Sequence, residues 1–301
     1  MIEESFNLRV GSAEFHMIKT LMAQRYRDTY RRIAASIFAG KIIHADETQV
    51  KLQRGQGYVW VLANLEEVIY LYRPGREGDF LQELLKDFRG VLISDFYAAY
   101  DSVACSQQKC LLHLMRDLNH DLLRSPYDDE YKSLVAEFGR LLRTIVSTID
   151  KYGLKKRHLT KHITDVDRFF RLVATQQYHS ELAEMYQRRL LKNGDVLFTF
   201  LRFDGVPWNN NGAEHAIKHF AYYRVIADGM MTEAGLDDYL VLLSIYQTCN
   251  YKGISFLKFL LSREEDVNTF MTSVTRRRAA RSSIDLYPDG FSSNHPKRRV
   301  K

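Results

Sequence analysis

Three acidic residues that lie far apart in the chain could together bind divalent cations. Asp46 and Asp95 each follow a short apolar run that predicts a strand, and Glu214 lies at the start of a predicted helix. Carboxylate oxygens are the ligands that Mg²⁺ prefers, and a pocket of this kind can hold two ions roughly 3.5–4 Å apart. Two ions held in this way drive phosphodiester chemistry. The three acids therefore predict a metal-dependent site, provided that the fold brings them together.

Each acid also has a purely structural interpretation. Asp46 could cap a turn, and Asp95 could cap a helix that begins at Phe96, because Asp is favoured at that position. Glu214 stands three residues after Asn211, which is the spacing of a capping box. The hypothesis of a metal site therefore depends on the convergence of all three acids.

The elements around Asp46 and Asp95 predict an α/β fold. Apolar periodicity indicates a strand at 41–44, a hairpin at 58–63 and 68–72, a helix at 77–88, a strand at 91–94, a helix at 96–104, and a short strand at 109–112 followed by a helix through 123. This order favours a mixed sheet with crossover helices. A right-handed crossover makes the first and fourth strands neighbours, so Asp46 and Asp95 would lie side by side.

Helical patterns dominate the rest of the chain. We expect an N-terminal helical segment at 1–40, a first part of the core at 41–126, an all-helical insertion at 127–203, the remainder of the core with its C-terminal helices at 204–262, and a basic, flexible tail at 263–301. The insertion would separate the second and third acids. Within 204–262, helices are expected at about 212–222, 235–251 and 255–261.

The basic charge is concentrated in the tail. The chain has a formal charge of +6, and residues 276–301 contain eight Lys and Arg against two Asp, so the remainder is neutral. Clustered like charges predict a flexible segment that attracts a polyanion, most simply nucleic acid; a solubilising tail is the alternative. The candidate DNA-binding residues are Arg276, Arg277, Arg278, Arg281, Lys297, Arg298 and Arg299.

Composition narrows the class of protein further. With 301 residues, 46% hydrophobic and 27% charged, the chain is typical of a soluble globular protein. It has no apolar run long enough for a bilayer and no secretory signal, so we expect the cytoplasm. Three cysteines fit a reducing compartment. Cys110 and His113 have ligand-like spacing, but a lone pair lacks the second pair of a structural zinc site.

Four ordered blocks resemble those of the DDE transposases of bacterial and archaeal insertion sequences, most closely the insertion sequence sixty-six family. The blocks are Asp46-Glu47-Thr48 with Trp60 downstream, Ser94 to Tyr100, Lys109 to Arg116, and Pro207 to Glu214, and the segment from Tyr239 to Gly253 resembles the family's C-terminal helix. The resemblance runs from about residue 41 to 262. The chain departs from the family pattern at Asn209, where Asp is usual, and at His215, where Arg is usual.

The resemblance implies an RNase H-like mixed sheet flanked by helices. It also implies two Mg²⁺ (or Mn²⁺) ions held by Asp46, Asp95 and Glu214, which would be the catalytic residues. The reaction would be hydrolysis at a transposon end, followed by attack of the freed 3′ hydroxyl on target DNA. The residues expected beside the metal ligands or on DNA phosphates are His113, Arg116, Lys218, Asn210 and Arg224.

The expected partners are double-stranded DNA, both element ends and target, and a second copy of the chain, because transposition generally pairs two ends. A nucleoid-associated protein of a bacterium or archaeon is expected. The alternatives are a DNA-binding remnant that no longer transposes and a structure-specific nuclease with the same core. Relatives usually carry an upstream DNA-binding region, and only about 40 residues precede this core. The chain would then be a truncated copy, a separately encoded catalytic piece, or a protein that recognises ends differently.

Overall fold

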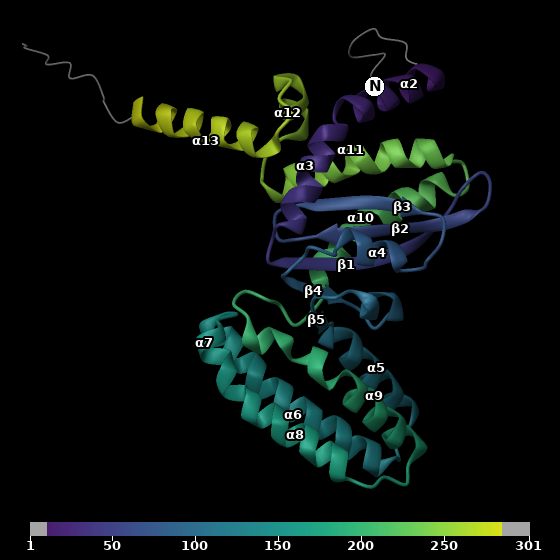
Figure 1. Ribbon diagram of the computed structural model, residues 1–301, viewed down its shortest axis with the longest axis vertical. Coiled ribbons are helices and arrows are strands. Elements are labelled where there is room, and N and C mark those ends of the chain that lie inside the picture. Colours follow the sequence, from purple (N-terminus) through teal and green to yellow (C-terminus); the bar gives the residue numbers. More distant parts are fainter. Residues whose placement is uncertain (1–10, 285–301) are drawn as a thin grey trace, which may run out of the picture.

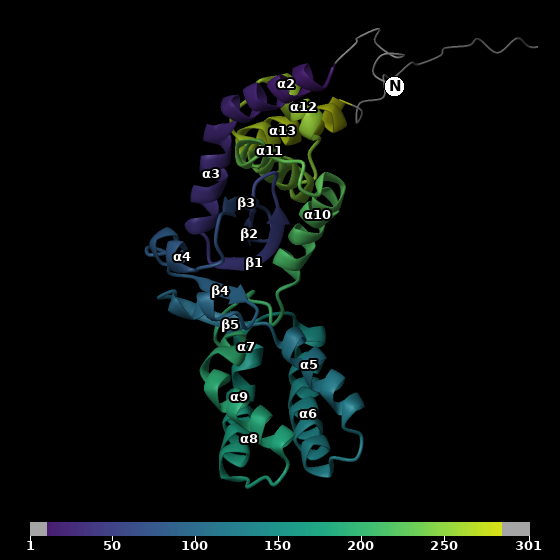
Figure 2. The same ribbon diagram turned by 90° about the vertical axis from the view of Figure 1, so that its right-hand side faces the viewer.

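A five-stranded mixed sheet lies at the centre of the molecule, with helices on both faces and a helical lobe beyond one edge. The computed structural model describes residues 11–284 (Figure 1). Figure 2 shows the lobe below the sheet, next to strand β5. Within residues 11–284 no helix combines the length and apolarity that crossing a membrane requires.

The sheet joins an antiparallel meander to two parallel strands. Its strands are β1 (Ile42–Lys51), β2 (Gln56–Ala63), β3 (Val68–Arg73), β4 (Val91–Ser94) and β5 (Ser106–Lys109). Their spatial order is β3-β2-β1-β4-β5, with β1, β2 and β3 antiparallel and β4 parallel to both β1 and β5. The predicted β2–β3 hairpin and the predicted pairing of the first and fourth strands are both confirmed.

Strand β1 is longer than the sequence pattern predicts. We expected it to end at His44, but it continues to Lys51 through a polar stretch. The reason is the antiparallel ladder with β2, in which Asp46 pairs with Val61 and Val50 pairs with Gly57. Asp46 therefore lies within a strand, and the interpretation of this residue as a turn cap is wrong.

Helices cover the two faces of the sheet. They are α2 (Ser12–Arg25), α3 (Arg27–Phe38), α4 (Asp79–Leu84), α10 (Asn211–Ala227), α11 (Glu233–Tyr251), α12 (Phe256–Ser262) and α13 (Val267–Ile284). Successive side chains of a strand point to opposite faces. Val59 and Val61 accordingly pack in one cluster with residues of α10 and α11. Trp60 and Leu62 pack in another, with residues of α3 and α4.

A bundle of helices forms the lobe. Its elements are α5 (Leu111–Arg124), α6 (Asp129–Tyr152), α7 (Lys156–Leu159), η2 (Thr160–His162), α8 (Ile163–Thr175), α9 (Glu181–Leu197) and η3 (Thr199–Arg202). Leu134, Phe138 and Phe169 lie in its apolar core. The side chain of Asp128 caps α6, and that of Ser180 caps α9. The described residues of the segment 127–203 thus have the predicted helical character.

The segment after residue 262 differs from the expected flexible tail. Helix α13 spans Val267–Ile284, and its first turn is anchored because Val267 and Phe270 are buried in the same cluster as Phe259. Figure 1 shows α13 extending away from the sheet, on the side opposite the lobe. The candidate DNA-binding residues Lys297, Arg298 and Arg299 lie outside the described residues.

Candidate metal centre

Asp46 lies on β1 and faces α10. It occupies the same face of the sheet as its partner Val61, which packs against α10 and α11. Its Oδ1 accepts a hydrogen bond of 2.9 Å from the backbone N–H of Glu47. Burial, followed by the negative charges of Glu47 and Asp95, raises the pKa of Asp46 to about 7. The carboxyl group of Asp46 is therefore held where its negative charge is unfavourable.

Asp95 is the first residue after β4. The parallel pairing of Ile42 with Val91 and of His44 with Ile93, continued by two residues, brings Asp95 level with Asp46. The effect of Asp95 on the pKa of Asp46 agrees with this register. Asp95 Oδ1 accepts a hydrogen bond of 2.9 Å from the backbone N–H of Tyr97.

The helix predicted at 96–104 is a shorter 3₁₀ helix, η1 (Ala98–Ser102), with Tyr97 at its N-cap. Asp95 consequently stabilises the turn before this helix and is not its N-cap. This local role fixes the backbone at the end of β4, where Asp95 lies level with Asp46.

Glu214 lies in the first turn of α10. The N-cap of α10 is Asn210, and no side chain caps this helix, so Glu214 does not close a capping box. Its Oε1 is buried and has no hydrogen-bond partner among the described residues. The nearest cationic group is His113, whose Nδ1 lies 3.7 Å from this oxygen. A buried acceptor without a donor is uncommon in proteins.

His113 interacts electrostatically with each of the three acids. It lies on α5 and is 30% exposed. The neighbouring side chain of Cys110, together with the charges of Glu214 and Asp95, raises the pKa of His113, while burial opposes this effect. The positive charge of His113 in turn lowers the pKa of Asp46. The charge of His113 is thus coupled to each of the three acids, and Glu214 is the one that lies within 4 Å of its ring.

Asn210 connects the three elements that carry Asp46, His113 and Glu214. It is fully buried, its Nδ2 donates 2.8 Å to the carbonyl of Ala45, and its Oδ1 lies 3.1 Å from Nδ1 of His44. Its backbone N–H donates to Sγ of Cys110 at 3.2 Å. Asn210 therefore joins β1, α5 and α10. Because it is fully buried, it is placed to position these elements and not to contact a DNA phosphate.

His44 is a functional neighbour that the sequence analysis missed. Its ring packs directly on Gly212, where an added Cβ would lie 2.9 Å from the imidazole carbons. Burial lowers the pKa of His44 to about 4, so the ring is neutral near pH 7. The sequence offered one sign of this role, since His44 interrupts the apolar residues Ile42, Ile43 and Ala45.

Glu47 was also missed as a site residue, and it anchors the strand from the opposite face. Its side chain is 2% exposed and accepts hydrogen bonds from Arg76 at 2.6 Å and from the hydroxyl of Tyr100 at 2.5 Å. The ring of Tyr100 packs edge-on against Trp60. The first two sequence blocks thus contact each other beneath the sheet.

Among the remaining candidate DNA-binding residues, two are exposed and one forms hydrogen bonds within the protein. Arg116 on α5 and Lys218 on α10 are exposed. Arg224 is half-buried and donates to Oγ1 of Thr48 and, at 2.8 Å, to the carbonyl of Gln49, so it holds α10 to β1. The backbone positions of Arg276, Arg277, Arg278 and Arg281 lie on α13.

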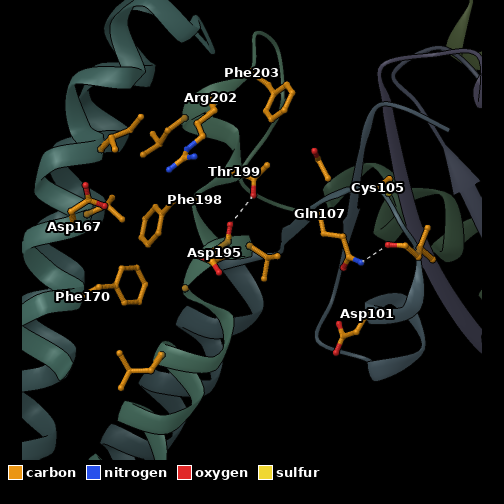
Figure 3. A pocket seen from close by; sticks show the side chains of 18 residues that line it. Asp101, Cys105, Gln107, Asp167, Phe170, Asp195, Phe198, Thr199, Arg202 and Phe203 are labelled. Atoms are coloured by element: carbon orange, nitrogen blue, oxygen red, sulfur yellow. Dashed lines mark hydrogen bonds between the residues drawn. The ribbon is translucent and has the colours of Figure 1, made fainter.

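A groove of about 860 Å³ lies elsewhere, between the edge of the sheet and the lobe. Figure 3 shows Cys105 and Gln107 on its sheet side and Phe170 and Asp195 on its lobe side. The three acids and His113 do not line it. The candidate metal centre is therefore separate from this groove.

A comparison with protein families identifies the chain. The sequence model described as "Transposase IS66 family" matches residues 14–238, about three quarters of the chain. The chain belongs to the transposase IS66 family. The matched range contains the sheet, the lobe and all three acids, and the resemblance found in the sequence is confirmed at this level. No curated protein matches the chain. Membership of the IS66 family implies a DNA-cleaving enzyme in general, with DNA as its partner.

Proposed function

We propose that this member of the IS66 family is a DDE transposase with an RNase H-like core. It would cleave one strand at the ends of an insertion sequence and transfer the resulting 3′ hydroxyl to target DNA. The strand order β3-β2-β1-β4-β5 supports this core. The observation that supports the proposal is the approach of the acids: the strand register brings Asp95 level with Asp46, the charge of Asp95 raises the pKa of Asp46, and the charges of Glu214 and Asp95 both raise the pKa of His113.

The donor set is suited to magnesium. Asp46 is held among other negative charges, and Glu214 has a buried oxygen without a donor. Asp46, Asp95 and Glu214 would hold two Mg²⁺ or Mn²⁺ ions, since carboxylate oxygens are the preferred ligands of these hard cations. When bound, such ions activate the attacking oxygen and stabilise the leaving oxygen.

The other residues around the acids would bind and orient the DNA. His113 can carry a proton beside Glu214 because its pKa is raised, and it could donate a hydrogen bond to a phosphate oxygen. Arg116 follows His113 by three residues on α5, and Lys218 follows Glu214 by four on α10, so each lies on the same helix face as its neighbour. Both are exposed and would attract the DNA backbone.

A direct test uses purified protein, labelled DNA that carries the element ends, and magnesium. We expect nicking at the end, followed by joining of the 3′ end to a second DNA, and we expect Asp95→Asn to abolish both while the protein remains folded. The matched control is Asp101→Asn, an acid that pairs with Lys109 instead.

Other outcomes would favour other functions. Nicking without joining would indicate a structure-specific nuclease, and a salt-sensitive gel shift without cleavage would indicate a DNA-binding remnant. If Asp95→Asn cleaves as well as the parent chain, the acids are not the site. We further propose that the active complex contains at least two copies of the chain, which sedimentation with paired ends would detect.

A further inference from the structure

Cys110, His113 and Glu214 bring together three different types of metal ligand. One ligand atom from each side chain lies within 4.8 Å of the other two, and Nδ1 of His113 is 3.7 Å from Oε1 of Glu214. In a tetrahedral zinc site with bonds of about 2.0–2.3 Å, ligand atoms lie roughly 3.3–3.8 Å apart. Small side-chain rotations would therefore bring the three ligand atoms to the spacing of a zinc site.

Two of these ligand atoms have no partner. Nδ1 of His113 and Oε1 of Glu214 are both buried without a hydrogen bond in the described part of the chain. They face each other across a gap that is too long for a direct hydrogen bond. A cation between them would satisfy both atoms at once.

The sulfur of Cys110 is held in place by its surroundings. Its side chain is fully buried, and its Sγ accepts a hydrogen bond from the backbone N–H of Asn210 at 3.2 Å. Cys110 is also the N-cap of α5, a helix of 14 residues. The sulfur is thus fixed in place near the ligand atoms of His113 and Glu214.

We propose that Cys110, His113 and Glu214 bind a thiophilic divalent cation of the zinc type. Cys110 and His113 come from the first turn of α5, and Glu214 supplies from α10 the third ligand that the lone sequence pair lacked. The thiol of Cys110 releases its proton to water as the sulfur–metal bond forms. The fourth position is open to water or a DNA phosphate. A sulfur ligand selects against magnesium, which prefers oxygen.

Glu214 belongs both to this site and to the proposed magnesium ligands. A cation held by Cys110 would therefore withdraw Glu214 from the magnesium ligands, so that zinc and magnesium would compete for one carboxylate. This consequence, unlike the binding itself, rests on the proposed transposase function.

Cobalt(II) is a suitable probe, because its absorption spectrum reports both tetrahedral geometry and a bond to sulfur. We expect titration of the metal-free full chain to produce visible bands and a near-ultraviolet thiolate band that saturate at one equivalent. Cys110→Ser should remove the thiolate band and weaken binding at least about tenfold. Glu214→Gln should keep the thiolate band and weaken binding.

Two controls exclude other sites. Cys105→Ser removes the half-buried thiol that lines the groove beside β5 and should leave the spectrum unchanged. His219→Ala breaks the His215–His219 pair on α10, whose rings lie 4.9 Å apart, and should also have no effect. If Cys110→Ser fails to fold, as judged by circular dichroism, His113→Ala takes its place.

A parent chain without a thiolate band would overturn the proposal. It would also fail if the band survived in Cys110→Ser, or if it disappeared in Cys105→Ser or His219→Ala. The result does not depend on cleavage activity, so failure of the proposed function would leave this test intact. Where cleavage is observed, zinc should inhibit the parent chain at concentrations at least about tenfold below those needed with Cys110→Ser, each measured against its own zinc-free rate.

Discussion

The hydroxyl of Tyr100 lies 2.5 Å from Oε2 of Glu47, and this contact joins the segment that carries Asp95 to the strand that carries Asp46. Adjacent residues of a strand face opposite sides of the sheet. Glu47 is therefore anchored beneath the sheet, while Asp46 faces α10. Tyr100 of the second sequence block thus holds Glu47 of the first block in place, and with it the strand that carries Asp46.

Removal of this hydroxyl should destabilise the fold. We expect Tyr100→Phe to lower the free energy of unfolding by about 1.5–3 kcal/mol, because it removes a hydrogen bond to a buried, charged acceptor. Urea unfolding measures the change. Tyr97→Phe is the matched control, since the Tyr97 hydroxyl donates to the carbonyl of Arg76 at the surface. Equal losses in the two variants would contradict the anchoring role of Glu47.

Asp46→Asn should stabilise the metal-free protein at alkaline pH. The folded protein raises the pKa of Asp46 from an ordinary value of 3.8 to about 7, so ionisation of this group opposes folding. Its penalty is absent below about pH 4, grows between pH 4 and 7, and is complete above pH 7. We expect the advantage of the variant to reach on the order of 3 kcal/mol at pH 8.

Thermal or urea unfolding of the parent chain and Asp46→Asn at pH 4 and pH 8 checks this difference. Asp150→Asn is the control, because this exposed acid lies on α6 in the lobe. Magnesium should stabilise the parent chain more than Asp46→Asn at pH 8. If Asp46→Asn is less stable than the parent chain at both pH values, ionisation of Asp46 does not oppose folding.

His44 should make an opposite contribution to the dependence of stability on pH. Burial lowers the pKa of His44 from 6.5 to about 4, so the unfolded chain takes up a proton at a higher pH than the folded chain does. The stability that neutral His44 supports is present above pH 6.5 and is lost as the pH falls toward 4. We therefore expect the deficit of His44→Phe, measured by urea unfolding, to shrink by about 2–3 kcal/mol between pH 7 and pH 4.

The comparison with the parent chain at each pH separates this effect from that of Asp46. His120→Gln, at an exposed position on α5, should follow the parent profile. A deficit of His44→Phe that stays constant across this range would show that His44 does not contribute through its protonation.

Arg116 and Lys218 should each add one phosphate contact to DNA binding. We expect Arg116→Gln and Lys218→Gln each to reduce the slope of log Kd against log salt concentration by about 1, with little change in stability. Fluorescence anisotropy at several salt concentrations measures the slope. Lys258→Gln, exposed on α12, should leave it unchanged. Unchanged slopes in both test variants would place the DNA path elsewhere.

The sequence predicted those parts of the site that follow from local pattern and chain topology. Buried apolar runs located β2, β3 and β4, and the rule of right-handed crossovers correctly paired β1 with β4. Local pattern failed where a distant segment decides the structure. The polar half of β1 is a strand because β2 pairs with it, and α13 is anchored because Val267 and Phe270 pack in the cluster that contains Phe259.

The buried polar network shows the same limit. His44 and Asn210 are 166 positions apart, and no spacing rule connects them. Each is unremarkable by itself, since His and Asn are common residues in loops and at helix ends. Their roles become clear only when both are found buried and in contact, with Gly212 packed against the imidazole.

The chain leaves the sheet for the lobe and returns from it at nearly the same place. The backbone N–H of Leu111 donates to the carbonyl of Trp208 at 3.0 Å, and the backbone N–H of Asn210 donates to Sγ of Cys110 at 3.2 Å. The roughly one hundred residues between these points form a cassette whose two ends are hydrogen-bonded to each other. Evolution could resize or exchange that cassette without moving any of the three acids.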